Sequence, residues 1–189
     1  MQFVTFLQAK KSPSSTTKAA PLRPGALTLR DAFGFHRDCE VCSLSLPGLQ
    51  ISDTRRIQIQ HLDDAIGDSN HVLGKPDACL ADCHSLLQLL EEEFKAGALI
   101  AKLYYDAFQI SITHSDQARA SVFAQRAYES RVICEGRDNP ETQRMKGFME
   151  YPANHLNFEA SKSWKTVKAL LPKGLDPEDF EKWLWRQAR

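Results

Sequence analysis

Two cysteines at C-x-x-C spacing, Cys39 and Cys42, have the residue type and the spacing best suited to metal chemistry in this chain. They follow an aromatic pair, Phe33 and Phe35, that is separated by a single glycine. Thiolates at this spacing are common zinc ligands, but a structural zinc site normally has four ligands arranged as a tetrahedron. Cys39 and Cys42 are therefore the candidate metal ligands, and together they supply half of such a set.

A second pair, Cys79 and Cys83, lies four residues apart with His84 next to it. This spacing places both thiols on one face of a helix, where they could complete a site with the first pair. The competing interpretation, which we favour, is that Cys83 is a small apolar member of a helix stripe. The six histidines show no H-x-x-x-H or H-E-x-x-H spacing. His155 is expected to pack against or cap a turn, and Cys134 is expected to be a buried thiol.

Length and composition limit the class of protein. A chain of 189 residues with 42% hydrophobic residues can form one domain, or one domain with an arm. Its 24 basic and 24 acidic side chains balance, which gives no support for direct nucleic-acid binding. No apolar run reaches the length of a membrane helix, and the opening residues do not resemble a signal peptide. Five cysteines without a dense framework indicate reduced thiols. We expect a soluble intracellular protein, in the nucleus or the cytoplasm.

The elements that position these residues are predicted to be mainly α: a flexible arm over 1–26, an irregular segment over 27–50, and an antiparallel helical array over 51–189. Apolar residues recur at three- and four-residue spacing through most of the array. The helices at 98–113 and 117–135 form a hairpin about the size of a tetratricopeptide unit, roughly 34 residues, although no clean second copy is present. Further helices are predicted near 53–66, 77–94, 140–151 and from 177 onward, with a polar connection at 68–75.

Capping signals set the expected helix ends. Pro47-Gly48 indicates a turn, after which Ser52 and Asp53 suit a helix start. Asn139 and Asp176, each followed by proline, are stronger start signals. Gly136 and Pro152 are expected to end helices. In the last helix Trp183 is predicted to lie in the core, and Trp185, about 200° further round the helix, to be exposed.

Several motifs also occur in a recognisable order. Residues 29–35, followed by the thiols, resemble the exit from the catalytic core of SET–MYND-type lysine methyltransferases. Further motifs match in sequence order: 42–44, 52–56, 62–63, 105–110, 123–127, 135–136, 152–155 and 180–185. Over about 27–189 the chain is therefore similar to the C-terminal part of a fungal SET-domain protein-lysine methyltransferase, consisting of a post-SET segment and a TPR-like helical domain.

This resemblance implies roles for the aromatic pair. Phe33 would occupy the lysine channel at a position where tyrosine is usual, and phenylalanine cannot hydrogen-bond the substrate amine. Phe35 would stack on the adenine of S-adenosylmethionine. We favour the alternative, that both rings pack at a domain boundary. The family's post-SET pattern C-x-C-x-x-C has Arg37 at its first position here, which leaves Cys39 and Cys42 as the zinc ligands implied.

The family's Asn-His-x-Cys cofactor motif and glycine-containing cofactor loop are not found in the sequence. Because methyl transfer needs both substrates enclosed and aligned, we expect no activity and no bound S-adenosylmethionine from this chain alone. The expected function is a non-catalytic helical protein-interaction module. Its partner would be a histone or another lysine-bearing protein, with Arg119, Arg126 and Tyr128 as exposed-face candidates. The alternatives are a truncated or split S-adenosylmethionine-dependent protein (histone) lysine N-methyltransferase whose SET core is supplied elsewhere, and a small zinc-dependent scaffold.

Overall fold

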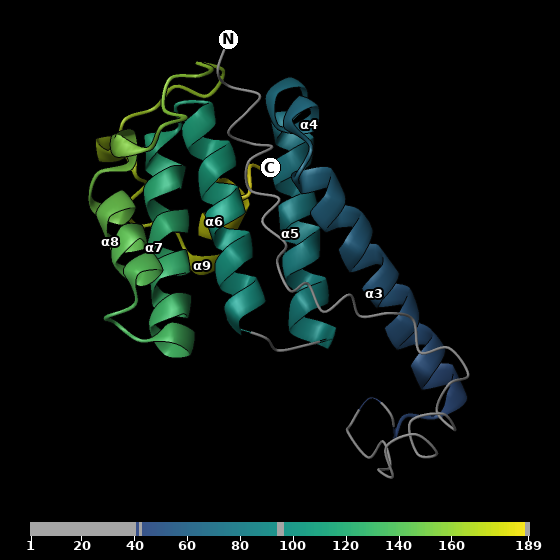
Figure 1. Ribbon diagram of the computed structural model, residues 1–189. Coiled ribbons are helices and arrows are strands. Elements are labelled where there is room, and N and C mark those ends of the chain that lie inside the picture. The colour runs from purple at the N-terminus through teal and green to yellow at the C-terminus, as the bar shows by residue number, and fades with distance from the viewer. Residues whose placement is uncertain (1–40, 42, 94–96, 188–189) are drawn as a thin grey trace. The chain divides into compact units, whose positions relative to one another are not determined.

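The computed structural model describes residues 41, 43–93 and 97–187. The arm predicted over 1–26 and the candidate site residues Phe33, Phe35, Cys39 and Cys42 lie outside the described residues. Within the described residues the fold is mainly α, as predicted. These residues form no β-strand, and Asp116 and Thr166 form an isolated β-bridge. The elements are α3 (Leu46–Ile66), α4 (Ser69–Gly74), α5 (Pro76–Glu93), α6 (Gly97–Thr113), α7 (Gln117–Glu135), α8 (Pro140–Glu150), the short 3-10 helices η1 (Pro152–Asn154) and η2 (Lys168–Leu170), and α9 (Pro177–Leu184) (Figure 1).

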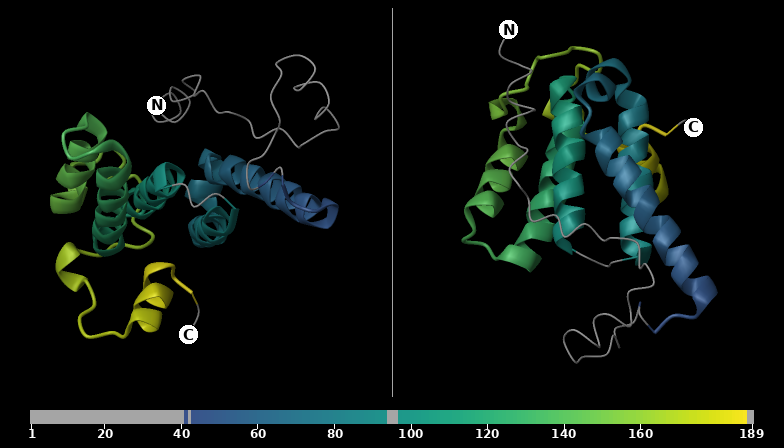
Figure 2. Two further views of the ribbon diagram at one scale, coloured as in Figure 1. Left: turned by 90° about the horizontal axis from the view of Figure 1, so that it is seen from below. Right: turned by 45° about the vertical axis from the view of Figure 1, so that its right-hand side comes forward.

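The chain divides between Gln60 and His61 into two compact units, so α3 begins in the first unit and ends in the second. In the second unit α5, α6, α7 and α8 pack in sequence order, each against its neighbour, and α4 packs on α5. Short connections make neighbouring helices run in opposite directions. Helix α9 returns to lie along one side of this row (Figure 2). This arrangement agrees with the predicted antiparallel array, while its likeness to tetratricopeptide repeats stays a prediction.

Helix α3 begins earlier than predicted. Ser45 is its N-cap, because the Gly48 N–H donates to the Ser45 hydroxyl over 3.4 Å. Pro47 and Gly48, predicted as a turn, form the first helical turn instead. Proline is tolerated there because the first N–H groups of a helix have no intrahelical partner. Ser52 and Asp53 are interior residues of α3 rather than caps, and the prediction of the start was wrong by about two turns.

The connection predicted at 68–75 contains the short helix α4. Asp68 is its N-cap, and its carboxylate accepts a hydrogen bond from the Asn70 N–H at 2.9 Å. None of the residues of α4 is fully buried. An apolar stripe, the signal on which helix prediction depends, is therefore absent from this segment.

The later helices confirm the predicted bounds closely. Helix α7 begins and ends at the predicted residues, and Gly136 follows it with a φ of 86°, a conformation that favours glycine. Asn139 and Asp176 cap α8 and α9 through their side chains, as predicted. Because the signals at these ends are local, the sequence was sufficient to place them.

The core of the second unit lies between α5, α6 and α7. Helix α6 is buried on most of its circumference, and α7 contributes small residues that allow its neighbours to approach closely. The α5 stripe includes both Cys79 and Cys83, which are fully buried. The largest fully buried apolar side chains are Leu80, Leu103, Phe108, Ile110, Ile112, Phe123, Met145, Leu184 and Trp185.

The prediction for the two C-terminal tryptophans was wrong. Trp185 is 2% exposed, whereas Trp183 is only half-buried. Trp185 is the C-cap of α9, and its N–H donates to the Glu181 carbonyl at 2.9 Å. The helical wheel gives the angle between the two side chains, but it does not show which of them faces the neighbouring helices. The Trp185 ring packs against Phe123 of α7, with 4.9 Å between the ring centroids.

Candidate interaction surface

The α5 cysteines behave as core residues. Burial, followed by the negative charges of Asp82, Asp106 and Asp68, raises the pKa of the Cys79 thiol to about 12. Burial also raises the pKa of Cys83 well above its ordinary value. Without a metal ion both groups are therefore neutral thiols, as expected for small apolar members of the α5 stripe.

His84, the third member of this candidate set, belongs to a different cluster. Its ring stacks on Trp185 at 4.9 Å between centroids, and its Nδ1 hydrogen-bonds the Gln187 side chain at 2.8 Å. Within the described ranges no group of three or more potential ligands is placed to hold a metal ion. The predicted ligands Cys39 and Cys42, like the channel and adenine positions Phe33 and Phe35, lie outside those ranges and stay predictions.

Arg119 and Arg126, offered from the sequence as exposed-face residues, are half-buried and bind within the chain. The Arg119 side chain is 11% exposed, and its Nε donates to the Trp183 carbonyl at 2.8 Å while its guanidinium stacks on the Trp183 ring. Arg126 forms an ion pair with Glu181 of α9. Tyr128 is half-buried as well. The two arginines therefore fasten α9 onto α7.

Glu181 is at the centre of that attachment. It accepts hydrogen bonds from Arg126 Nη1 at 3.0 Å and from Trp185 Nε1 at 3.1 Å. Burial alone would raise the pKa of Glu181, but the hydrogen bond and charge of Arg126 outweigh it and hold that pKa below its ordinary value. At the edge of the same cluster burial lowers the pKa of His84. This cluster stabilises the C-terminal end of the fold.

A second polar cluster is buried at the turn between α6 and α7. Asp116 is fully buried and is the N-cap of α7. One carboxylate oxygen accepts from the Arg119 N–H at 3.2 Å and from the Thr166 hydroxyl at 2.7 Å. The other oxygen pairs with Arg119 Nη1 at 2.7 Å. The turn itself requires a positive φ of 64° at Ser115. Asp116 thus links α7 to a loop fifty residues further along the chain.

His114 anchors the same loop from the other side of the turn. Its Nε2 donates to the Val72 carbonyl at 2.8 Å, and its Nδ1 is 3.0 Å from the Ser161 hydroxyl. Its ring packs on Trp164, which is itself almost fully buried. His114 thereby joins α4, the α6–α7 turn and the loop after η1.

Backbone hydrogen bonds complete the attachment of this loop. The N–H groups of Ser161, Trp164 and Thr166 donate to the carbonyls of residues 113, 114 and 115 at 2.8, 3.1 and 3.0 Å. Beyond them the Lys168 ammonium donates to the Met149 and Glu150 carbonyls at 2.9 and 3.1 Å, at the end of α8. The loop is consequently held in one conformation although most of its side chains face solvent.

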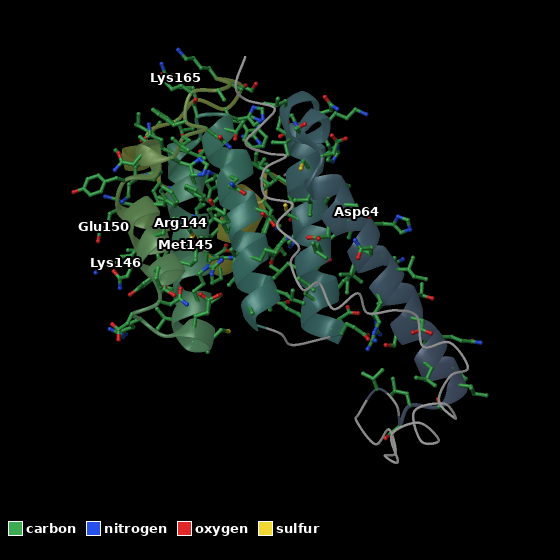
Figure 3. The ribbon with its side chains drawn as sticks, in the orientation of Figure 1. Asp64, Arg144, Met145, Lys146, Glu150 and Lys165 are labelled. Atoms are coloured by element: carbon green, nitrogen blue, oxygen red, sulfur yellow. The ribbon has the colours of Figure 1, made fainter. Side chains whose placement is uncertain are left out.

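The surface that this loop presents combines apolar and basic side chains. We define the α8–η2 surface by its exposed apolar and lysine residues: Tyr151, Leu156, Lys162, Lys165, Val167, Leu170 and Lys173. Lys165 points outward at one end of the helical row, and Lys146 and Glu150 point away from α8 on its outer side (Figure 3). Met145 on the opposite side of α8 is fully buried. Residues 160–175 contain four lysines and no acidic residue.

The opposite charge gathers on α5, at the end of α3 and at Asp68, the N-cap of α4. Residues 61–93 contain eight acidic residues and one lysine. Part of this charge has partners: Asp63 pairs with Lys102 at 2.6 Å, Asp77 with Arg186 at 2.7 Å and Asp82 with His71 at 2.8 Å. Glu91 at the end of α5 is exposed. The balanced net charge of the chain therefore conceals two oppositely charged regions.

Sequence reasoning missed both the buried polar junction and the charge separation. Asp116 directly precedes the predicted start of α7, so its capping role could have been inferred. The acid-free run at 160–175 was also visible in the sequence. The contacts of His114 with Val72 and Ser161 join segments more than forty residues apart, and no local pattern indicates them. His155, in contrast, packs against Phe108 and Phe148 as expected. Cys134 is exposed, so the prediction that it is buried was wrong.

Comparison with known proteins supports a relationship to the SET family of methyltransferases. The chain is 27% identical over 158 residues to the histone-lysine N-methyltransferase set5 of Schizosaccharomyces pombe (strain 972 / ATCC 24843), a match that covers 83% of this chain and 48% of that protein. The chain thus spans about half the length of the curated relative it matches. No family model matches the chain, and no solved structure does. Among the described helices none has both the length and the apolar character needed to cross a membrane.

Proposed function

We propose that this chain is a non-catalytic helical protein-interaction module, corresponding to the post-SET segment and TPR-like helical domain at the C-terminal end of a fungal SET-domain protein-lysine methyltransferase. The observation that carries the proposal is the row of helices packed in sequence order, in a chain that is similar in sequence to set5. The matched chain is mainly an array of helices where the structure describes it. Helical arrays commonly present extended surfaces to peptides and other helices.

The partner proposed for this module is a histone or another lysine-bearing protein. Its support is the acidic region at 61–93, where eight acidic residues accompany one lysine. Surface charge of one sign attracts and orients a partner of the other sign, mainly by raising the rate of association. Glu91 and Glu92 are exposed at the end of α5 and are suitable positions for testing this contact.

The alternative is a truncated or split S-adenosylmethionine-dependent lysine methyltransferase, to which another chain supplies the SET core. The printed activity of the relative favours it, because set5 is a histone-lysine N-methyltransferase. In that case Phe33 and Phe35 would line the lysine channel and the adenine site, and Cys39 and Cys42 would bind zinc. Isothermal titration of the purified chain with S-adenosylmethionine distinguishes the two functions. A saturating heat signal with a micromolar constant would favour the alternative, whereas no heat is expected for the interaction module.

The interaction itself is tested by the fluorescence anisotropy of a labelled lysine-rich peptide of histone-tail composition. We expect binding that weakens as salt is added, because the contacts are between exposed charges. Replacing Glu91 and Glu92 by lysine should weaken the affinity about tenfold, since each exposed ion pair contributes roughly 0.2–1 kcal/mol and reversal adds repulsion. Asp138→Lys, an exposed acidic residue between α7 and α8, is the matched control. Failure of the unmodified chain to bind the peptide would overturn the proposed partner.

A further inference from the structure

We propose that the α8–η2 surface binds an acidic peptide segment that also carries apolar side chains. This inference adds a basic surface to the acidic one proposed for the interaction module. Each surface has its own binding test, so either proposal can be refuted without the other. It depends on three features of the structure: unpaired positive charge, exposed apolar groups beside that charge, and a rigid loop that presents both.

The positive charge is available for a partner. Lys162, Lys165 and Lys173 are exposed, and none of them forms an ion pair with a described acidic residue. Lys168 differs from them, because its ammonium is already engaged by two carbonyls at the end of α8. The run at 160–175 contains no acidic residue, and the carboxylates that flank it, Glu159 and Asp176, form no ion pair with these lysines. A carboxylate-bearing partner would supply the missing counter-charge.

Exposed apolar side chains occur in the same loop as these lysines and at the end of α8. Tyr151, Leu156, Val167 and Leu170 are between 49% and 73% exposed. The two carbonyls bound by Lys168 adjoin Tyr151, so the end of α8 and η2 are neighbours. Helix η2 and helix η1 both pack on α7, which brings the two apolar segments onto the same part of the fold. Clustered exposed apolar groups beside polar ones are characteristic of sites that bind other proteins.

The loop is held rigidly, which distinguishes it from an ordinary surface loop. Three backbone hydrogen bonds join it to the α6–α7 turn. Thr166 is fixed by the buried Asp116 carboxylate, and Ser161 by the buried His114 ring. Trp164 is buried beneath it, with the Arg186 guanidinium 4.2 Å from the ring centroid. Because the loop is already ordered, a partner loses little affinity in ordering it.

These features favour a peptide over a nucleic acid. A phosphate backbone would satisfy the lysines, but its contacts are largely polar and would leave Leu156, Val167 and Leu170 in water. Only one aromatic ring, Tyr151, is exposed on this surface for stacking on bases. An acidic peptide with interspersed leucines would pair with the lysines and also cover the apolar groups.

The test uses a fluorescein-labelled peptide in which aspartate and glutamate alternate with leucine, titrated with the full 189-residue chain. Anisotropy should show saturable binding. The double variant Lys162→Glu with Lys165→Glu should weaken binding at least about tenfold and reduce its salt dependence. Leu170→Ser should weaken it about threefold without changing the salt dependence, because it removes apolar contact only. Lys75→Glu, an exposed lysine beside α5, is the control and should bind normally.

Several results would overturn the proposal. These are no saturable binding, unchanged binding by the double lysine variant, or unchanged binding by Leu170→Ser. Comparable or tighter binding of a DNA duplex, or of vesicles containing anionic phospholipid, would assign the surface to another class of partner. Binding of the lysine-rich peptide should be unaffected by the lysine substitutions. If the acidic peptide does not bind, the proposed function is therefore not refuted. Far-UV circular dichroism of each variant confirms that the helices are intact.

Discussion

Replacing Asp116 by alanine should destabilise the fold far more than loss of an ordinary helix cap. Asp116 is fully buried, caps α7 through the Arg119 N–H, pairs with the Arg119 guanidinium and accepts from the Thr166 hydroxyl. The substitution removes all of these contacts together. It also removes one of the bonds that fix the loop carrying the α8–η2 surface, because the Thr166 hydroxyl loses its acceptor.

The largest of the losses sets the magnitude, because the separate figures describe overlapping contacts and are not additive. Loss of an N-cap costs about 1 kcal/mol. A buried hydroxyl or guanidinium left without its partner costs about 1–3 kcal/mol, and breaking a buried ion pair typically costs about 3–5 kcal/mol. Arg119 keeps its bond to the Trp183 carbonyl and its stacking on that ring, which limits the loss. We therefore expect a decrease of about 3–5 kcal/mol in the free energy of unfolding.

Asp176→Ala is the matched control, because Asp176 is also an aspartate N-cap. Its carboxylate accepts from the Asp179 N–H at 2.8 Å, but the residue is exposed and forms no buried ion pair. Its replacement should cost only about 1 kcal/mol. Asp116→Asn provides an intermediate case, since it keeps an oxygen to cap α7 but loses the charge that pairs with Arg119.

The assay is urea unfolding followed by far-UV circular dichroism and tryptophan fluorescence, with the slope compared among variants to check two-state behaviour. The stability of Asp116→Ala should fall below that of Asp116→Asn, which should fall below that of Asp176→Ala. If the two alanine variants agree within about 1 kcal/mol, the buried contacts contribute nothing beyond capping, and the account of the junction is wrong.

Three further predictions concern other parts of the chain. Arg126 holds the pKa of Glu181 below its ordinary 4.5, so the stability that this carboxylate contributes is present above that pH and is lost as the pH falls below it. On acid titration the free energy of unfolding of Glu181→Gln should therefore decrease less steeply than that of the unmodified chain. Iodoacetamide at neutral pH should label the exposed Cys134 rapidly in the native chain and the two buried α5 thiols only on unfolding, as mapped by mass spectrometry. Gly136→Ala, at a φ of 86°, should lower the melting temperature, whereas Gly147→Ala, within α8 and with open space around the added methyl group, should raise it by the equivalent of about 0.5–1 kcal/mol.

Local signals in the sequence located most helix ends because the atoms that determine them are close in sequence. Asn139 and Asp176 cap helices by accepting from N–H groups two or three residues ahead. Gly136 ends α7 through its own backbone conformation. The start of α3 was misplaced because Ser52 and Asp53 have capping side chains but lie inside a continuing helix. A residue type that can cap shows only where a helix could begin.

Features that depend on tertiary contact could not be predicted in the same way. The burial of Trp185 follows from the rings on α5, α6 and α7 that surround its indole. The exposure of Cys134 follows from the position of the last turn of α7, whose outer side remains uncovered. Tryptophan and cysteine side chains can each be buried or exposed. Only the packing of helices distant in sequence determines which of the two applies.

The distribution of charge connects the fold with its proposed interactions. Composition alone gave a net charge of zero, which gave no support for direct nucleic-acid binding. In the structure the acidic residues at 61–93 lie on α5, at the end of α3 and at the N-cap of α4, whereas the lysines at 160–175 lie on a loop fixed to the α6–α7 turn. The two regions meet where Arg186 pairs with Asp77 at 2.7 Å and lies over the Trp164 ring, so part of the acidic charge is neutralised there. A chain of zero net charge can still carry an acidic and a basic segment, and each can attract a partner of the opposite sign.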